Sequence, residues 1–597
     1  MTEAVEKIVR IGGASGFWGD SSVGPAQLVA AGNIDYLVFD YLAELTMSLL
    51  AGARMKNPDA GYATDFVTVA MASVLKDVVA KGIRVVSNAG GVNPQGCAKA
   101  LGELARSLGI PDLRIAVIEG DNVLPLLGEL AQEDVRELQS GKPLPEKLVS
   151  ANAYLGALSV RDALDAGAQV VITGRCVDSA VTLGALMHEF GWQANDYDRL
   201  AAGSLAGHVI ECGCQATGGL HTDWESVPDW ANIGYPIVEC HADGSFVVSK
   251  PEGTGGLVNC ATVGEQILYE IGDPANYLLA DVACDFRHVR LEQQGKNRVR
   301  VAGAKGRAPT AFYKVSATYT AGFRTSAQLT IVGIDAVRKA QRTGAALIER
   351  SAGIFDRMGL PAFTATNVEV LGAESTYGPL AQAAGTREAV LRVTVSHSQK
   401  AALELFAREI AAAGTSWSPG TTGAGGRPSV SPSIRQFAFL LDKMRLQPKV
   451  VIGPVEIPTL MPPVPPAESA TPLETDMEQA ASLEPDVEVP LVQLAYARSG
   501  DKGDISNIGV IARTPALLPV LRAQLGAARV AGYLAHLVKG PVTRYDLPGL
   551  GAMNFVCEQA LGGGGMASMR NDPLGKGMAQ ILLSMPVRVP QSMVPKT

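Results

Sequence analysis

Five stretches in the first 190 residues share one pattern: a short apolar, β-branched run, a small polar cluster, and then a helix-like segment. They span residues 7–20, 34–44, 83–94, 114–122 and 168–178. Short apolar strands that alternate with helical segments are typical of βαβ units and of a parallel sheet buried on both faces. Ligands bind in the crevice at the carboxyl ends of such strands. The pattern predicts an N-terminal α/β domain with a mainly parallel sheet and a polar, charged rim.

The middle of the chain changes character. A β-rich portion at about 200–330 contains hairpin patterns at 235–250 and 288–303 and a long strand-like run at 313–333. After it, α/β alternation returns up to about residue 450. The pattern leaves open whether this portion is inserted into the first domain or forms a lobe beside it.

The chain of 597 residues is too long for one hydrophobic core, because single cores stop growing at roughly 250–300 residues. Residues 451–490 are dense in Pro and acidic residues and lack a helical or strand period, which predicts a linker. Residues 491–597 read as a separate, small α+β sandwich domain. We therefore predict an α/β domain at 1–450 and a second domain after the linker.

The overall composition excludes several classes of partner. Hydrophobic residues make up 47% of the chain and charged residues 18%, which is typical of a well-packed globular protein. A formal net charge of −8 indicates no basic surface for nucleic acid or an anionic membrane. Eight scattered cysteines and a charged N-terminus without a signal-peptide pattern favour reduced thiols and a cytoplasmic protein. We expect small-molecule partners and a homo-oligomer.

The strand ends supply candidate acids, bases and cations. Asp40 and Glu44 are four residues apart at the second strand end and share a face if a helix has begun there. Crowded carboxylates can share a proton and so act in acid–base catalysis, although such residues are also ordinary helix N-terminal charges. Arg175 and Asp178 follow the fifth strand, where Arg can clamp a carboxylate or phosphate, or form an internal ion pair. These four residues are the predicted catalytic group.

Glycine-rich turns at the strand ends supply candidate substrate-binding residues. The stretch GGASGFWGDS follows the first strand and matches neither the dinucleotide nor the P-loop fingerprint. Its backbone N–H groups suit an anion, and its two aromatics suit the wall of an apolar pocket; a tight turn is the simpler interpretation. The predicted binding residues from the strand ends and the later glycine-rich loop are Gly13, Ser15, Phe17, Trp18, Asp20, Asn88, Gly90, Gly91, Asn93, Asp121, Asn122 and Arg427.

No pattern in the chain demands a metal or a redox cofactor. His208, Glu211, Cys212 and Cys214 form the best cluster, but their spacing matches no standard zinc arrangement, so no metal ligand is predicted. The sequence leaves open whether a divalent cation binds among the Asp and Glu residues.

The stretch ARSGDKGDISNIG at 497–509 carries more charge than a hairpin turn needs. A solvated hairpin is one interpretation, because exposed Asp–Lys pairs contribute little. We favour the other, in which Gly500 and Gly503 let the loop dock near the strand-end crevice of the main domain or of a neighbouring subunit. Arg498, Asp501 and Lys502 are then predicted to contact substrate, with Lys502 at a phosphate.

Several motifs occur together in one order along the chain: GGASGFWGDS, FDYLAELTM, NAGGVNP, EGDN, VITGRCVDSA, GTTGAGGRP and ARSGDKGDISNIG. In this combination the chain resembles the acyclic terpene utilisation AtuA family over nearly its full length. The resemblance implies an AtuA domain over about 1–450 and a ferredoxin-fold domain over about 490–590. It further implies a cytoplasmic role in breaking down branched acyl-CoA compounds of the citronellol and geraniol type, beside carboxylase and hydratase steps. It brings no settled reaction and no established catalytic residues.

Three functions agree with these observations. The first is a hydratase or lyase on a branched acyl-CoA, with Asp40, Glu44 and Asp178 in acid–base roles and coenzyme A present only as part of the substrate. The second is a CoA transferase or thioester hydrolase, which needs a nucleophile such as Glu44, Glu211 or Cys212. The third is a non-catalytic acyl-CoA-binding or assembly subunit for a carboxylase, with the C-terminal domain as the assembly module.

Overall fold

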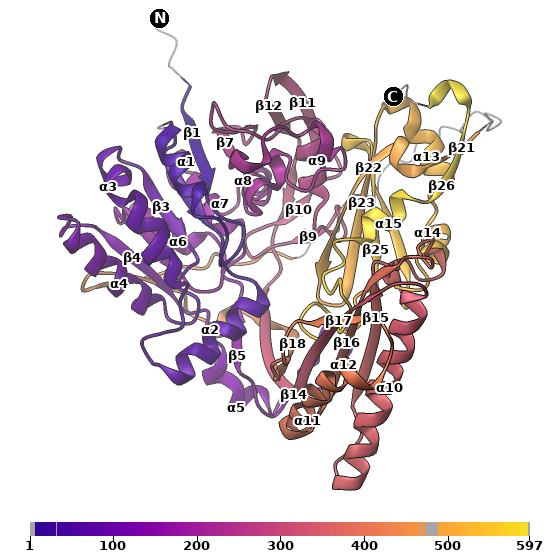
Figure 1. Ribbon diagram of the computed structural model, residues 1–597. Coiled ribbons are helices and arrows are strands. Elements are labelled where there is room, and N and C mark those ends of the chain that lie inside the picture. Colours follow the sequence, from indigo (N-terminus) through magenta and orange to yellow (C-terminus); the bar gives the residue numbers. More distant parts are fainter. Residues whose placement is uncertain (1–5, 32, 467–468, 472–486, 595–597) are drawn as a thin grey trace, which may run out of the picture.

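The computed structural model describes residues 6–31, 33–466, 469–471 and 487–594. Three units meet in it: an N-terminal α/β unit that includes the β-rich middle, a unit built on a second sheet, and the C-terminal domain (Figure 1).

The five predicted strands form the centre of the largest sheet. They are parallel neighbours in the order β1-β2-β3-β6-β4, so the predicted parallel core is confirmed. Their bounds are β1 Ile8–Gly13, β2 Tyr36–Phe39, β3 Arg84–Ser87, β6 Val170–Thr173 and β4 Ile115–Glu119. All five carboxyl ends therefore point to one edge of the sheet.

Antiparallel strands extend this core on both sides to eleven strands, so the sheet as a whole is mixed. On the β1 side lie the two predicted hairpins, which places the β-rich middle in the N-terminal sheet. Their strands are β7 Ile237–His241, β8 Phe246–Ser249, β11 Arg290–Gly295 and β12 Arg298–Ala302. On the β4 side lie β19 (Lys449–Ile452) and β20 (Val455–Pro458). The sheet thus continues into the first residues of the predicted linker, and residues 467–468 and 472–486 of that linker lie outside the described residues.

Helices cover both faces of the parallel core, because alternate strand residues point to opposite sides. Tyr36 and Val38 enter one apolar core, while Leu37 and Phe39 enter the other. The first core includes residues of α6 (Leu158–Asp165), α7 (Ala180–Phe190) and α8 (Tyr197–Ile210), and the second those of α1 (Val23–Ala31), α3 (Ala72–Ala80) and α4 (Pro94–Ser107). The polar ends of the strands are left free at the edge.

The second sheet is organised by one long strand, β14 (Phe312–Val332). Its first half pairs with β5 (Ser150–Ala153) and β18 (Ser431–Asp442), and its second half with β16 (Glu388–His397) and β17 (Thr421–Ala424). The edge strand β15 is Ala365–Leu371, and the apolar sides of α10 (Ala336–Met358) and α11 (Lys400–Glu409) pack on this sheet. Because β5 comes from the N-terminal third, its pairing joins the first two units.

The C-terminal domain is a small α+β unit with a four-stranded antiparallel sheet in the order β22-β23-β25-β24. These strands are β22 Ala495–Lys502, β23 Ile505–Ala512, β25 Ala552–Cys557 and β24 Val542–Leu547. The helices α13 (Leu518–Gln524), α14 (Ala527–Tyr533) and α15 (Met578–Leu583) complete its core. The predicted final strand at 579–589 begins instead as α15 and becomes a strand only at β26 (Pro586–Val589), which pairs with β21 (Val487–Pro490).

The β22–β23 hairpin packs on the segment that follows α9 (Cys260–Leu268). Asn507 donates from Nδ2 to the Leu268 carbonyl at 2.7 Å and accepts from the Glu270 backbone N–H at 2.9 Å. A Cβ atom on Gly509 would lie 2.5 Å from Leu268 Cβ, so only glycine allows this approach. The hairpin is thereby fixed with its tip at the strand-end edge of the first sheet.

Candidate functional site

The rim of the parallel sheet brings together side chains that follow four different strands. Asn88, after β3, donates from Nδ2 to Oδ1 of Asp40, which follows β2. Arg175, after β6, donates from Nη1 to Asp178 Oδ1 at 2.8 Å. The backbone N–H of Arg175 also donates to Asp121 Oδ2, after β4, at 2.9 Å. The predicted meeting of strand-end residues is found for Asp40, Asn88, Asp121, Arg175 and Asp178.

Two of these carboxyl groups bind protons more tightly than usual. Burial, together with the charges of Asp178 and Glu211, raises the pKa of Asp40 well above its ordinary value. Burial raises the pKa of Asp121 to about 6, although it accepts hydrogen bonds from Arg175 and Asn152. Burial thus favours the protonated form of Asp40, which suits this carboxyl to donate a proton.

Glu44 opens α2 (Glu44–Lys56) and is held as a carboxylate by three partners. Tyr154 Oη donates to Glu44 Oε1 at 2.6 Å, Gln436 Nε2 donates at 3.2 Å, and Lys314 Nζ lies 3.8 Å away. Burial opposes ionisation, but the charges of Lys314, Arg175 and Lys502 lower the pKa of Glu44. Arg175 also stacks over the Tyr154 ring at 4.0 Å, which links Glu44 to the rim.

A buried histidine–carboxyl pair lies at the C-terminal end of α8. His208 Nδ1 and Glu211 Oε1 are 2.8 Å apart, and Nε2 of His208 has no hydrogen-bond partner among the described residues. Burial disfavours the charged imidazole, but Glu211 raises the pKa of His208 overall. Burial likewise raises the pKa of Glu211, with Asp178 adding to the effect. The pair can hold and exchange a proton beside the rim.

The C-terminal domain adds cations to the same place. Lys502 Nζ lies 3.4 Å from Glu270 Oε2, and Lys576 Nζ lies 3.4 Å from Glu270 Oε1 and 3.0 Å from Asp501 Oδ1. Burial favours a neutral amine, yet Glu270 and other nearby acids raise the pKa of Lys502 well above its ordinary value. Burial raises the pKa of Asp501 to about 6, against the opposing charge of Lys576. Lys502 is thus a permanent cation among groups that exchange protons.

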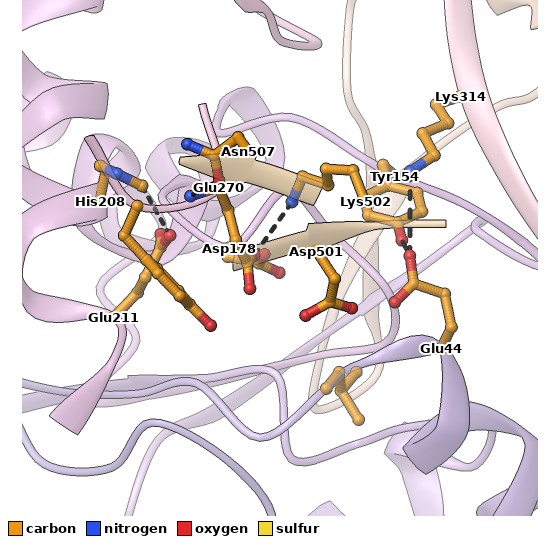
Figure 2. A network of polar contacts seen from close by, with 12 residues as sticks. Glu44, Tyr154, Asp178, His208, Glu211, Glu270, Lys314, Asp501, Lys502 and Asn507 are labelled. Carbon is orange, nitrogen blue, oxygen red and sulfur yellow. Dashed lines mark hydrogen bonds and ion pairs between the residues drawn. The ribbon is translucent and has the colours of Figure 1, made fainter. Parts of the chain in front are cut away.

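We call this assembly the central cluster, and Figure 2 shows its parts gathered in one region, with Lys502 Nζ directed toward Glu270. Its side chains come from all three units. Glu44, Asp178 and Glu270 remain partly open to solvent, at 28%, 26% and 24% exposed. Its members are Asp40, Glu44, Tyr154, Arg175, Asp178, His208, Glu211, Glu270, Lys314, Asp501, Lys502 and Lys576. Proton-holding carboxyls beside fixed cations can move protons and stabilise a developing anion.

Both parts of the chain match known family models. Residues 9–452 match the acyclic terpene utilisation family protein AtuA, and residues 489–588 match the AtuA ferredoxin-like domain. The chain belongs to the AtuA family. Membership implies a role in acyclic terpene utilisation. Searches of curated proteins and of solved structures found no match. No helix in the described part of this AtuA chain combines the length and apolarity needed to cross a membrane.

The first glycine-rich turn of the AtuA domain is largely occupied in holding its own shape. Asp20 accepts from the Gly16 N–H at 2.9 Å and from Tyr235 Oη at 3.0 Å, and Ser15 Oγ donates to the Asp40 carbonyl at 3.0 Å. Trp18 packs on the second apolar core, while Phe17 is 58% exposed. Ser15 therefore positions the Asp40 backbone, and the predicted binding role of the other residues stays a prediction.

Several further predicted binding residues have structural roles in helix caps, turns or close backbone packing. Asn93 caps α4 by accepting from the Gly96 N–H at 3.1 Å, and Asn122 accepts from the Leu124 N–H at 3.1 Å. A Cβ atom on Gly90 would lie 2.5 Å from the Thr173 carbonyl oxygen, and one on Gly13 would lie 2.4 Å from that of Ile210. Gly91 adopts a positive φ of 55°.

Arg498 and Arg427 make no ion pair with the acids of the central cluster among the described residues. Arg498 is buried and donates to the Leu220 carbonyl at 2.6 Å and to Gln215, so it joins the AtuA ferredoxin-like domain to the segment after α8. Arg427 lines a separate cleft against the second sheet.

Sequence reasoning missed four members of the central cluster, Tyr154, Glu270, Lys314 and Lys576, and it missed the pairing of His208 with Glu211. The signal for Tyr154 is weak but present, since it directly follows β5 and precedes a glycine two residues on. Glu270 adopts a positive φ of 59°, which no sequence pattern indicates.

Cys212 and the residues around it favour neither a metal site nor a thiolate. Among the described residues no group of three or more His, Cys, Asp or Glu side chains is arranged to hold a metal ion. Burial, with the charges of Glu211 and Glu270, raises the pKa of the Cys212 thiol well above its ordinary value. A thiolate nucleophile is therefore disfavoured there.

Proposed function

We propose that the central cluster catalyses acid–base chemistry on a branched acyl-CoA of acyclic terpene breakdown, as a hydratase or lyase. The observation that carries the proposal is the combination of carboxyls whose pKa is raised by burial, Asp40 and Glu211, with the fixed cation Lys502. An acid or base needs a pKa near the working pH, and an enolate needs a positive charge close by.

The two reactions share their proton steps. In hydration, Glu211 takes a proton from water as its oxygen bonds to carbon 3, and the electron pair of the double bond moves onto the thioester as an enolate. In cleavage, Glu211 takes the proton of the 3-hydroxyl, carbon 3 leaves as the carbonyl carbon of a ketone or aldehyde, and the electron pair of the broken bond between carbons 2 and 3 moves onto the thioester as the enolate of a shorter acyl-CoA. Asp40 then supplies a proton to carbon 2, and Lys502 stabilises the enolate oxygen. His208, at 2.8 Å, orients Glu211.

Thioester transfer through Glu44 is the second candidate. Its low pKa keeps a carboxylate available to attack a thioester carbonyl, which releases the CoA thiolate and forms an acyl anhydride. However, Tyr154, Gln436 and Lys314 all engage this carboxylate, and such contacts lower its nucleophilicity. Acid–base chemistry therefore fits the geometry better.

Hydrogen exchange at carbon 2 tests the proposal directly. The protein is incubated in D₂O with branched 2-enoyl-CoA and 3-hydroxyacyl-CoA thioesters, and mass spectrometry follows deuterium entry and product formation. We expect Glu211→Gln to slow both by about 100-fold or more, as removal of a general base does. Asp198→Asn is the matched control, because Asp198 pairs with Lys305 at the surface at 2.8 Å.

Two results would count against acid–base catalysis. An acyl or CoA adduct trapped on Glu44, with no deuterium entry at carbon 2, would favour transfer. No turnover of any thioester, together with co-purification of a carboxylase, would favour the assembly role.

A further inference from the structure

A second polar site lies between the second sheet and the C-terminal domain. This cleft has a volume of about 570 Å³, within the usual range for small-molecule sites. Four arginines line it, and we call it the arginine cleft: Arg324, Arg392, Arg427 and Arg570. They come from β14, β16, the loop before β18, and the glycine-rich segment after β25.

Three of the four arginines have no ion-pair partner in the part of the chain that the structure describes. Arg392 pairs with Glu369 at 2.5 Å, whereas among the described residues Arg324, Arg427 and Arg570 form no ion pair within 4.0 Å. Within the described part of the chain, the guanidinium groups of Arg324 and Arg570 donate only to carbonyl oxygens, those of Met566, Ala560 and Leu537. Like charges held close together without a counter-charge cost free energy, so the arrangement suits an external anion.

The nearby acids Asp504, Glu369 and Asp572 act on Arg570 only from a distance, without an ion pair among the described residues. Burial lowers the pKa of Arg570 although these three charges raise it. Asp504 Oδ1 accepts three backbone N–H groups, from Leu561, Gly563 and Gly564. Asp572 accepts the backbone N–H groups of Lys576 and Gly577. Burial and the neighbouring Arg392 lower the pKa of Arg324, as expected where a guanidinium lacks an anion.

The arginine cleft adjoins the central cluster through one segment. Residues 561–576 supply Arg570 to the cleft and Lys576 to the cluster, where Lys576 lies 3.0 Å from Asp501. Gly565 lines the cleft, and a Cβ atom placed on it would lie 3.7 Å from Asp501 Oδ2. A ligand with phosphates in the cleft can therefore extend past Gly565 toward the proton-transfer groups.

We propose that the arginine cleft binds the phosphate groups of the coenzyme A portion of the substrate and so directs its thioester end into the central cluster. The proposal rests on the proposed function for its ligand, but the cleft is a separate set of residues. Guanidinium groups bind phosphate oxygens in pairs of hydrogen bonds, and four of them match a ligand with several phosphates.

Isothermal titration with CoA, CoA lacking its 3′-phosphate, pantetheine and inorganic phosphate tests this site without turnover. Arg427→Gln is the first variant, because Arg427 is exposed and makes no hydrogen bond with a described residue, so the fold does not depend on it. Arg324→Gln is the second. Arg338→Gln is the matched control, since Arg338 lies 81% exposed on α10.

We expect each cleft variant to weaken CoA binding by about tenfold or more, the worth of a charge-assisted hydrogen bond. Removal of the 3′-phosphate should weaken binding to the natural chain and should weaken it less in the variants. CoA affinity within twofold of the natural chain in both variants would overturn the site. So would inorganic phosphate that competes as well as CoA does, because the cleft would then hold a free ion.

Kinetics separate this proposal from the proposed function. Turnover of acyl-CoA with an unchanged KM in Arg427→Gln and Arg324→Gln would refute the cleft and leave the acid–base chemistry standing. Loss of CoA binding in the variants of a chain that turns over no thioester would refute the chemistry and support the cleft.

Discussion

The central cluster and the arginine cleft lie side by side but differ in whether their cations have internal ion-pair partners. In the cluster each cation has a carboxylate near it: Lys502 faces Glu270 at 3.4 Å and Arg175 faces Asp178 at 2.8 Å. In the cleft three of the four arginines have no such partner among the described residues. Charges that are paired internally can hold geometry and exchange protons, whereas unpaired charges are suited to bind an anion from outside. The central cluster is therefore suited to catalysis, and the arginine cleft is suited to anchor the phosphates of the ligand.

Replacement of Lys502 by Met should give the largest effect. The variant removes the charge that would stabilise an enolate, so we expect kcat to fall by about 100- to 1,000-fold, as when an oxyanion donor is lost. CoA binding should stay unchanged, because the arginine cleft is intact. Steady-state kinetics and titration measure the two quantities on one preparation. Lys305→Met, at an exposed ion pair, is the control.

The opposite result for kcat and CoA affinity would contradict these roles of the two sites. If Lys502→Met kept its kcat and lost CoA affinity, Lys502 would be part of the anchor, as the sequence suggested when it placed this lysine at a phosphate.

Added salt should affect the arginine cleft more than the central cluster, and this effect should be smaller than that of Lys502→Met. Added salt screens the attraction between the arginine cleft and an incoming anion, whereas the ion pairs already formed within the central cluster are screened less. We expect the KM for an acyl-CoA to rise severalfold between about 50 and 500 mM NaCl, with kcat nearly constant. The same acyl group on pantetheine, which lacks the phosphates, should show a flat KM. A KM for acyl-CoA that does not change with salt would argue against an electrostatic anchor.

The fold could be predicted well where structure follows local pattern. The five parallel strands and both hairpins are confirmed, because each is a short apolar run between turn residues. The attachment of β19 and β20 to the sheet edge was missed, since the partner of an edge strand is decided by packing between distant segments. The start of the last predicted strand was wrong because ILL in α15 has the same apolar composition in a helix or a strand.

The candidate site was predictable only in the part that follows strand ends. Asp40, Arg175 and Asp178 stand out because parallel strands bring their carboxyl ends to one edge. Glu270 and Lys314 lie in ordinary local sequence and join the cluster from the segment after α9 and from β14. The arginine cleft was equally hidden, because its four arginines are spread over almost 250 residues and only Arg427 lies in a recognisable glycine-rich loop.

The smallest expected effect is a pH-dependent stability difference at Asp501, where the two sites meet. Its pKa of about 6 lies above the ordinary unfolded value of about 4, because burial disfavours the carboxylate. The folded chain therefore binds this proton more tightly than the unfolded chain. As pH rises from about 4 to about 6, the unfolded state ionises first, and Asp501 lowers the stability of the fold by about 3 kcal/mol at most. Above about pH 7 the loss is complete and constant.

Asp501→Asn lacks this titration. The Tm of the natural chain should therefore fall by a few degrees relative to that of the variant between pH 4.5 and pH 6.5, and the difference should then stay constant. Thermal unfolding followed by circular dichroism at several pH values measures it. Asp504→Asn is unsuitable as a control because Asp504 holds the glycine-rich segment, whereas Asp335→Asn removes an exposed carboxylate at the start of α10. A difference that is independent of pH would mean that Asp501 stays ionised throughout. The charge of Lys576, 3.0 Å from Asp501, would then outweigh the effect of burial on this carboxyl.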